Sequence, residues 1–252
     1  IWVQSTGKYF ILDKTLSGQV SSEVIAYWDA SNPSSYPQSG STVYDLSGNE
    51  NHFSLMNGTS YNFEGYFELD GVDDYIKSIN NIDLTSYDAI VVDITLRSID
   101  DTIYTQAFEH SANWNSNLGG FGLFINNNGS GYVKNQHHTN HNSEASRNYD
   151  LIIDDKWSNH INLFSKISDS TGRLVWGNGS LLPFTGGAST VTSAGGSFGD
   201  YIMYMGARGG TLYFNEIAFK SFKVYGIKFT NDQAYQNYYQ SPIVTDGLVF
   251  AV

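Results

Sequence analysis

Cysteine is absent from this chain of 252 residues, which excludes a disulfide framework and a cysteine-based metal centre. Long apolar runs are absent as well. No run approaches the roughly 20 residues that span a bilayer, and no basic segment precedes an apolar one near the start. The sequence therefore predicts no membrane insertion and shows no signal peptide. Because the chain opens with Ile1 rather than Met, we expect it to be a segment of a longer protein.

Positive charge is scarce. The chain has 13 Lys and Arg against 25 Asp and Glu, a net charge of −12. An acidic chain without a basic cluster repels nucleic-acid backbones, so we expect no nucleic-acid partner. Charged residues make up only 15% of the chain and aromatic residues another 15%. This balance, with many Asn, Ser, Thr and Gly residues, is typical of extracellular or particle-surface β-proteins.

Short strands with tight turns dominate the pattern. Apolar and polar residues alternate over 89–97, which predicts a strand with one buried face, and 160–164 has the same period. Residues 172–182 predict a hairpin around a Gly-Asn-Gly turn. The apolar phase slips within 215–229, which predicts a β-bulge near Lys220–Ser221. Such strands predict an antiparallel sandwich or barrel.

Two segments depart from the strand pattern. The polar stretch 126–148 shows no strand character and is predicted to be a loop. Residues 230–239 predict a helix, with Thr230 as its cap and Gln233 completing a capping box. Pro242 ends this helix and begins a linker.

Several motifs resemble a known family. The run "YWDASNPSSYPQSGSTVYDLSGNENHFSLMNG" (27–58) and the segment "FELDGVDDYI" (67–76) resemble the opening of laminin-G-like, concanavalin-A-like jelly rolls. We associate that variant with phage, giant-virus and marine bacterial surface proteins. Later stretches, "MGARGG" and "FNEIAFKSFKVYGIKF", resemble the family too, so the resemblance covers roughly 24–239. It implies an all-β fold, an antiparallel β-sandwich of jelly-roll type with one short C-terminal helix.

The resemblance also implies a domain organisation. We expect one laminin-G-like domain at 23–240, with 1–22 as an N-terminal segment or the end of a preceding domain. Residues 241–252 are expected to be a linker and the first strand of a following domain, because "TDGLVFAV" matches the entry into the present domain at "SSEVIAYW". The alternative is that this last strand pairs back onto the same domain and closes its sheet.

Catalytic motifs are missing. Laminarinase-like relatives of this fold carry Glu-x-Asp-x-x-Glu on one strand, which aims their carboxylates into one cleft. The strand predicted at 89–97 has one Asp and no Glu, and no Gly-x-Ser-x-Gly elbow occurs. The sequence therefore predicts a protein that is not an enzyme.

Three carboxylates crowd one turn. Asp70, Asp73 and Asp74 in "LDGVDDYI" are spaced to hold Ca²⁺ together with backbone carbonyls. The alternative is a plain hairpin turn at Asp70–Gly71, with the other two carboxylates solvated or capping backbone N–H groups. We expect no required cofactor, Ca²⁺ being the one candidate.

Two further groups are candidates for binding. His137, His138 and His141 lie within five residues, and His137 and His141 have the i,i+4 spacing of a helical metal pair, but the surrounding Asn and Thr favour an exposed loop. Tyr36, Trp114 and Tyr132 lie in predicted loops, where aromatic rings would stack on sugars while amides bond the hydroxyls.

These features predict a non-catalytic surface module of a virion, as a fibre, decoration or capsid-associated protein, or of a bacterial exterior. Its expected place is the virion surface or the extracellular or cell surface, within a larger oligomeric assembly. As a lectin-like adhesin it would bind surface glycans or neighbouring subunits. The alternatives are a purely structural decoration domain without a ligand and, third, a glycan-degrading enzyme on the same fold.

Overall fold

The computed structural model describes residues 2–5, 8–11, 23–98, 105–112, 119–125, 132–140, 143–150, 156–166, 174–186 and 197–240. It describes the backbone alone for β1 (Trp2–Ser5), β2 (Lys8–Ile11), β13 (Tyr132–Asn140), β18 (Phe184–Gly186) and, except for Tyr149, β14 (Ser143–Asp150). The linker and strand expected at 241–252 lie outside the described residues, so the expected domain boundaries stay a prediction.

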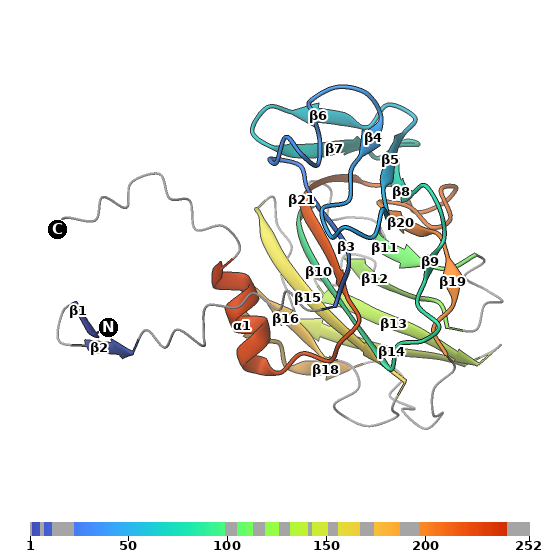
Figure 1. The fold of residues 1–252 in the computed structure, drawn as a ribbon. Coiled ribbons are helices and arrows are strands. Elements are labelled where there is room, and N and C mark those ends of the chain that lie inside the picture. The colour runs from blue at the N-terminus through green and yellow to red at the C-terminus, as the bar shows by residue number, and fades with distance from the viewer. Residues whose placement is uncertain are drawn as a thin grey trace.

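Two antiparallel sheets stack face to face within this part of the chain and form a β-sandwich (Figure 1). The first sheet has eight strands. Seven follow the order β17 (Ser180–Leu181), β16 (Val175–Gly177), β15 (Ser158–Ser165), β10 (Ala89–Ser98), β21 (Glu216–Tyr225), β7 (Tyr66–Asp70) and β6 (Ser60–Asn62), while β3 (Val24–Asp29) also pairs with β21.

The second sheet has nine strands among the described residues. Their order is β18, β14, β13, β12 (Phe121–Ile125), β11 (Thr105–His110), β20 (Met203–Met205), β8 (Tyr75–Ser78), β5 (Phe53–Met56) and β4 (Thr42–Val43). A short pair, β9 (Ile82–Asp83) with β19 (Asp200–Tyr201), lies outside both sheets. With the single described helix, α1 (Asn231–Gln240), this architecture confirms the predicted all-β sandwich. Among the described residues, no helix has the length and apolar character to cross a bilayer.

Aromatic side chains fill the space between the sheets. Trp28 is fully buried and lies at ring-centroid distances of 5.6 Å from Phe67 and 6.1 Å from Phe222. Phe53 of the second sheet meets the same tryptophan edge-on at 6.4 Å. Rings in these arrangements add stabilisation beyond their buried area, and here they join strands of both layers. The apolar phase of β3, β7 and β21 therefore sets the core.

Several sequence predictions are confirmed. The predicted strand at 89–97 is β10, and its apolar phase faces the core. Opposite Thr95 and Leu96 stand Ser221 and Phe219, so Lys220 is the extra residue of the expected bulge. The predicted hairpin is β16 and β17, joined through a turn with positive φ at Asn178 and Gly179.

The helix cap is confirmed in both directions. The Thr230 backbone N–H donates to Gln233 Oε1 at 2.9 Å, and the Gln233 N–H donates to Thr230 Oγ1 at 3.2 Å. This reciprocal pair satisfies two N–H groups that a helix start would otherwise leave without partners.

Helix α1 covers part of the outer face of the first sheet, the face that points away from the second sheet. It lies beside β15 and β16 (Figure 1) and buries Ala234 against Ile161 and Tyr225. Trp176 Nε1 donates to Asn231 Oδ1 at 3.0 Å. Beneath the helix the buried Asp93 accepts from Asn237 Nδ2 of α1 at 3.5 Å and from Asn159 Nδ2 at 2.6 Å, so the carboxylate of β10 is part of the helix-docking contacts.

Two expectations are wrong. The stretch 126–148 is not a loop throughout, because β13 and β14 pair along it as a long antiparallel hairpin. Its alternating residues are polar, so apolar periodicity could not reveal these strands. The turn at Asp70–Gly71 is not a hairpin turn either. It connects β7 of the first sheet to β8 of the second, and is therefore a corner between the layers.

The motif "DLSGNEN" secures the edge of β3 that is not paired with β21. Asp45 accepts the Tyr27 N–H, and the Asn51 side-chain amide donates to the Ile25 carbonyl at 2.8 Å. Asn49 Nδ2 donates to the Val24 carbonyl, also at 2.8 Å. Side chains thus occupy the backbone groups that a free strand edge would present to another chain.

Candidate functional site

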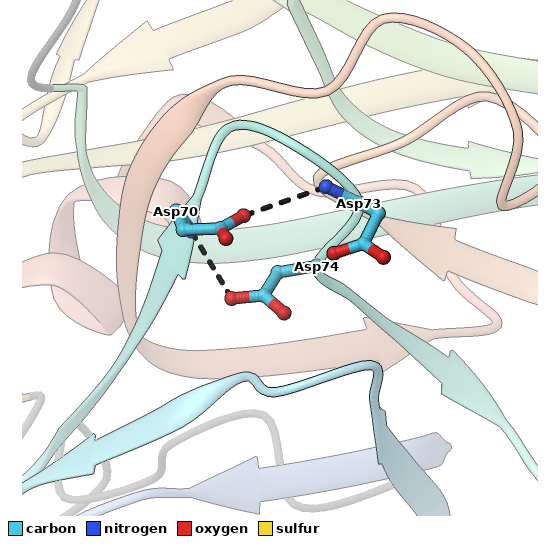
Figure 2. A group of neighbouring side chains, drawn as sticks. All are labelled: Asp70, Asp73 and Asp74. Atoms are coloured by element: carbon cyan, nitrogen blue, oxygen red, sulfur yellow. Dashed lines mark hydrogen bonds between the residues drawn. The ribbon is translucent and has the colours of Figure 1, made fainter.

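The three aspartates of the sheet-to-sheet corner lie close together, as Figure 2 shows. One carboxylate oxygen from each of Asp70, Asp73 and Asp74 falls within 4.8 Å of the others. Asp70 Oδ1 accepts the Val72 N–H at 2.8 Å and the Asp73 N–H at 3.4 Å, and Asp74 Oδ2 accepts the Asp70 N–H at 3.1 Å. The carboxylates therefore already shape the turn through backbone hydrogen bonds.

Glycine is required at the corner. Gly71 has φ of 76°, and a Cβ there would lie 2.8 Å from the Glu216 backbone nitrogen. The left-handed conformation and this close approach both exclude a side chain. As a result the aspartate turn sits directly against the start of β21.

The local environment shifts the pKa values of Asp70 and Asp74 in opposite directions. The Val72 N–H that Asp70 accepts lowers the pKa of Asp70 below its usual value. Burial raises the pKa of Asp74, which is 5% exposed, although the Asp70 N–H partly offsets this. Asp70 thus stays ionised to lower pH than Asp74 does.

A hollow of about 370 Å³ opens beside the turn. Carboxylates come to it from β7, from the corner and from β21, and no Lys or Arg lines it. Its lining residues are Asn57, Gly58, Ser60, Glu68, Leu69, Asp70, Asp74 and Glu216. A hollow with this lining offers hydrogen-bond acceptors to hydroxyl groups, amines or a cation.

Of the three predicted glycan-stacking residues, only Tyr36 has a described side chain. It is 5% exposed, packs edge-on against Phe67 at 5.0 Å, and its hydroxyl donates to the Gly40 carbonyl. Its ring is part of the core, so the prediction that it stacks on a sugar is wrong. Trp114 lies outside the described residues, and Tyr132 is placed only as the first residue of β13.

The histidine cluster falls on a strand. His137 and His138 belong to β13 and pair with Ala145 and Glu144, so a helical i,i+4 metal pair is excluded. His141 lies outside the described residues.

A second cluster, which sequence reasoning missed, lies on the outer face of the first sheet. We name it the aromatic–cation cluster: Tyr66, Glu68, Arg97, Trp157 and Lys220. The Arg97 guanidinium lies 5.5 Å from the Tyr66 ring and 5.4 Å from the Trp157 ring. Lys220 Nζ lies 4.2 Å from the same tryptophan ring. These residues come from three strands and one connection, so no sequence window contained the signal.

A third group lies on the second sheet. Glu109 of β11 is 1% exposed, accepts from Ser111 Oγ at 2.7 Å and lies 3.7 Å from Arg208 Nε. The Arg208 guanidinium lies 4.8 Å from the Tyr213 ring and 5.3 Å from the Phe124 ring. Burial raises the pKa of Glu109 to about 7, against the opposing effects of Ser111 and Arg208.

Comparison with known proteins identifies the fold. No family model and no curated protein matches the chain. Among solved structures, the chain is similar to the receptor-binding domain of botulinum neurotoxin mosaic serotype C/D, with a TM-score of 0.66 and 14% identity over 88% of this chain. It is also similar to the binding domain of botulinum neurotoxin DC in complex with rat synaptotagmin II (TM-score 0.64, 13% identity, 88% of this chain).

A third similar structure is the binding domain of botulinum neurotoxin DC in complex with SialylT, with a TM-score of 0.65 and 14% identity over 88% of this chain. In all three comparisons the chain spans 52% of the other chain, about half its length. At this identity the likeness shows the fold, a β-sandwich, and assigns no function by itself.

Proposed function

We propose that this chain is a non-catalytic binding module that recognises surface glycans or protein receptors. The observation that carries the proposal is the extent of the fold similarity, 88% of the chain, to domains solved as receptor-binding domains. Two of those structures contain their ligand, rat synaptotagmin II in one and SialylT in the other. A rigid sandwich that displays loops and corners is suited to such recognition.

The acidic hollow beside Asp70 and Asp74 is the proposed place for a hydroxyl-rich ligand. Carboxylate oxygens accept hydrogen bonds from sugar hydroxyls. The Asn57 side-chain amide also lines the hollow and donates to the Asp73 carbonyl at 2.7 Å. Ca²⁺ would bind at the same turn as an accessory ion rather than as a requirement, because the turn is already held by backbone hydrogen bonds.

The proposed setting is the surface of a virion or a bacterial cell, within a larger assembly. Repeated copies would then supply avidity to weak single contacts. The proposal assigns no reaction: Glu109, a buried carboxylate whose pKa rises to about 7, faces an arginine.

The test is binding of the whole 252-residue chain to a broad glycan array, with Ca²⁺ and again with a chelator. We expect binding to a defined set of glycans in both conditions, weakened by Asp70→Asn and unchanged by Asp200→Asn, an exposed control. No binding to glycans or to protein receptors at high concentration would overturn the proposal and favour a purely structural decoration domain.

A further inference from the structure

The aromatic–cation cluster occupies the part of the outer face that α1 leaves uncovered. In β10, Ile94 and Leu96 point into the core, so Arg97 points outward, as Val91 does under the helix. In β7 the core positions are Phe67 and Leu69, which puts Glu68 on that same outer face. Trp157 enters from the residue before β15 and meets the Tyr66 ring edge-on at 5.1 Å.

Lys220 reaches this cluster because it is the extra residue of the β21 bulge. Bulges bend the strand locally and re-aim a side chain, and they are enriched next to active sites. The flanking Phe219 and Phe222 both stay in the core. The bulge therefore lets the Lys220 side chain reach the Trp157 ring.

Of the two cations in the cluster, only Arg97 has an ion pair among the described residues. Arg97 has a carboxylate at 3.5 Å, Glu68 Oε1. Lys220 has no ion pair within the described part of the chain, and its ammonium lies over the Trp157 ring. Burial and the charge of Arg97 lower the pKa of Lys220, while Glu64, at longer range, opposes this. Holding an ammonium here costs free energy that a cation–π contact only partly offsets.

We propose that the aromatic–cation cluster binds an acidic glycan, one whose carboxylate or sulfate group pairs with Lys220 beside Arg97. This inference rests on the proposed function and names a ligand class and a second site for it. Among the described residues no carboxylate pairs with Lys220, and the anionic group would occupy that position. The adjoining Trp157 ring, which is half-buried, supplies apolar surface of the kind on which sugar faces pack, and the buried Tyr66 ring holds it in place.

The charge of the expected ligand distinguishes this site from the hollow beside Asp70. That hollow is lined by four carboxylates and repels anionic sugars, so it suits neutral ones. The two sites adjoin at Glu68, which lines the hollow and pairs with Arg97. Arg97 and Lys220 do not line the hollow, so the two sites predict different specificities on one domain. The net charge of −12 makes a general electrostatic attraction for acidic glycans implausible, so any such binding has to be local.

The test uses the full chain and paired probes that differ in the acidic group alone: sialyllactose against lactose, and a sulfated disaccharide against its unsulfated parent. The variants are Lys220→Gln, which removes the charge and keeps the length, and Trp157→Phe. Lys228→Gln is the matched control, an exposed lysine with the same loss of charge. Affinities are measured by titration calorimetry at low and high salt.

We expect the acidic probes to bind, more weakly at high salt, with about tenfold or greater loss of affinity in Lys220→Gln and none in Lys228→Gln. Trp157→Phe should weaken them to a smaller extent. Binding of neutral glycans alone, or acidic binding that Lys220→Gln leaves intact, would overturn this inference while the proposed function stands. Failure of the array to show any glycan would overturn this inference, and failure to bind protein receptors as well would remove the proposed function.

Discussion

Asp45 Oδ1 accepts a hydrogen bond from the backbone N–H of Tyr27 at 2.8 Å, across 18 residues of chain. The same carboxylate accepts the N–H groups of Ser47 at 2.9 Å and Asn51 at 3.0 Å, and the Ser47 hydroxyl at 2.6 Å. One aspartate therefore shapes its own loop and fastens that loop to the edge of β3. The motif that carried the family resemblance is explained by this structural role.

We expect Asp45→Ala to lower the free energy of unfolding by about 2–4 kcal/mol, because several backbone N–H groups lose a charged acceptor at once. Urea denaturation measures the change. Asp73→Ala is the control, since that exposed carboxylate accepts no hydrogen bond in the described structure. Equal midpoints for the two variants would show that the edge of β3 does not depend on Asp45.

The buried Glu109 predicts a pH dependence of stability. Its pKa rises from the usual 4.5 to about 7 in the folded protein, so the folded state holds a proton that the unfolded chain has already lost. The stability that this group contributes is fully present below about pH 4.5 and is lost as the pH rises through about 7. We expect Glu109→Gln to be the more stable protein at mildly alkaline pH, by up to about 3 kcal/mol.

Urea midpoints of Glu109→Gln and of the unaltered chain across pH measure this difference. The comparison has to be a difference, because burial lowers the pKa values of His110 and His160 to about 4 and gives stability the opposite slope below their usual 6.5. Glu50→Gln, at an exposed position, controls for the loss of one charge. Parallel pH profiles for all three proteins would contradict the prediction.

Removal of the capping box is expected to lower the stability of α1 by a modest amount. Thr230→Ala should cost about 1 kcal/mol, because the Gln233 N–H loses its side-chain acceptor at the start of α1. Thr230→Ser keeps the hydroxyl and should restore most of the difference. Hydrogen exchange in α1 and the urea midpoint measure both variants. An alanine variant that matches the serine variant would show that packing on Ala234 and Trp176 alone holds the helix.

Calcium binding at the corner is expected to be weak, with a dissociation constant on the order of 10⁻³ M. Asp70 and Asp74 already use oxygens as acceptors for backbone N–H groups, which leaves few free ligands for an ion. Calorimetry with CaCl₂ measures the affinity, and Asp73→Asn, which disturbs none of those bonds, should reduce it. Micromolar binding, or heat unaffected by Asp73→Asn, would contradict this expectation.

Predictions from sequence succeeded where a buried face imposed a period on the chain. β10, the bulge at Lys220, the β16–β17 hairpin and the helix cap all follow from local patterns. β13 and β14 were missed because their residues are polar on both faces. Tyr36 was taken for a loop aromatic because its burial depends on Tyr61 and Phe67, which are distant in sequence.

Some candidate sites could be predicted from the sequence and others could not. The three aspartates are neighbours in sequence, so their proximity could be predicted. The aromatic–cation cluster could not, because β7, β10, β15 and β21 meet only through strand pairing. The same holds for Glu109 and Arg208, 99 residues apart, since 208 − 109 = 99.

The bulge at Lys220 also makes the choice of side chain at this position independent of the strand register. Elsewhere in β21, replacing a residue disturbs either the core or the cross-strand partner on the outer face. Residue 220 has no partner opposite it in β10, so its side chain can vary while the ladder on both sides stays in register. A library randomised at this single codon would therefore sample new surface chemistry on an unchanged scaffold, which makes the position a natural starting point for engineering and for evolutionary diversification.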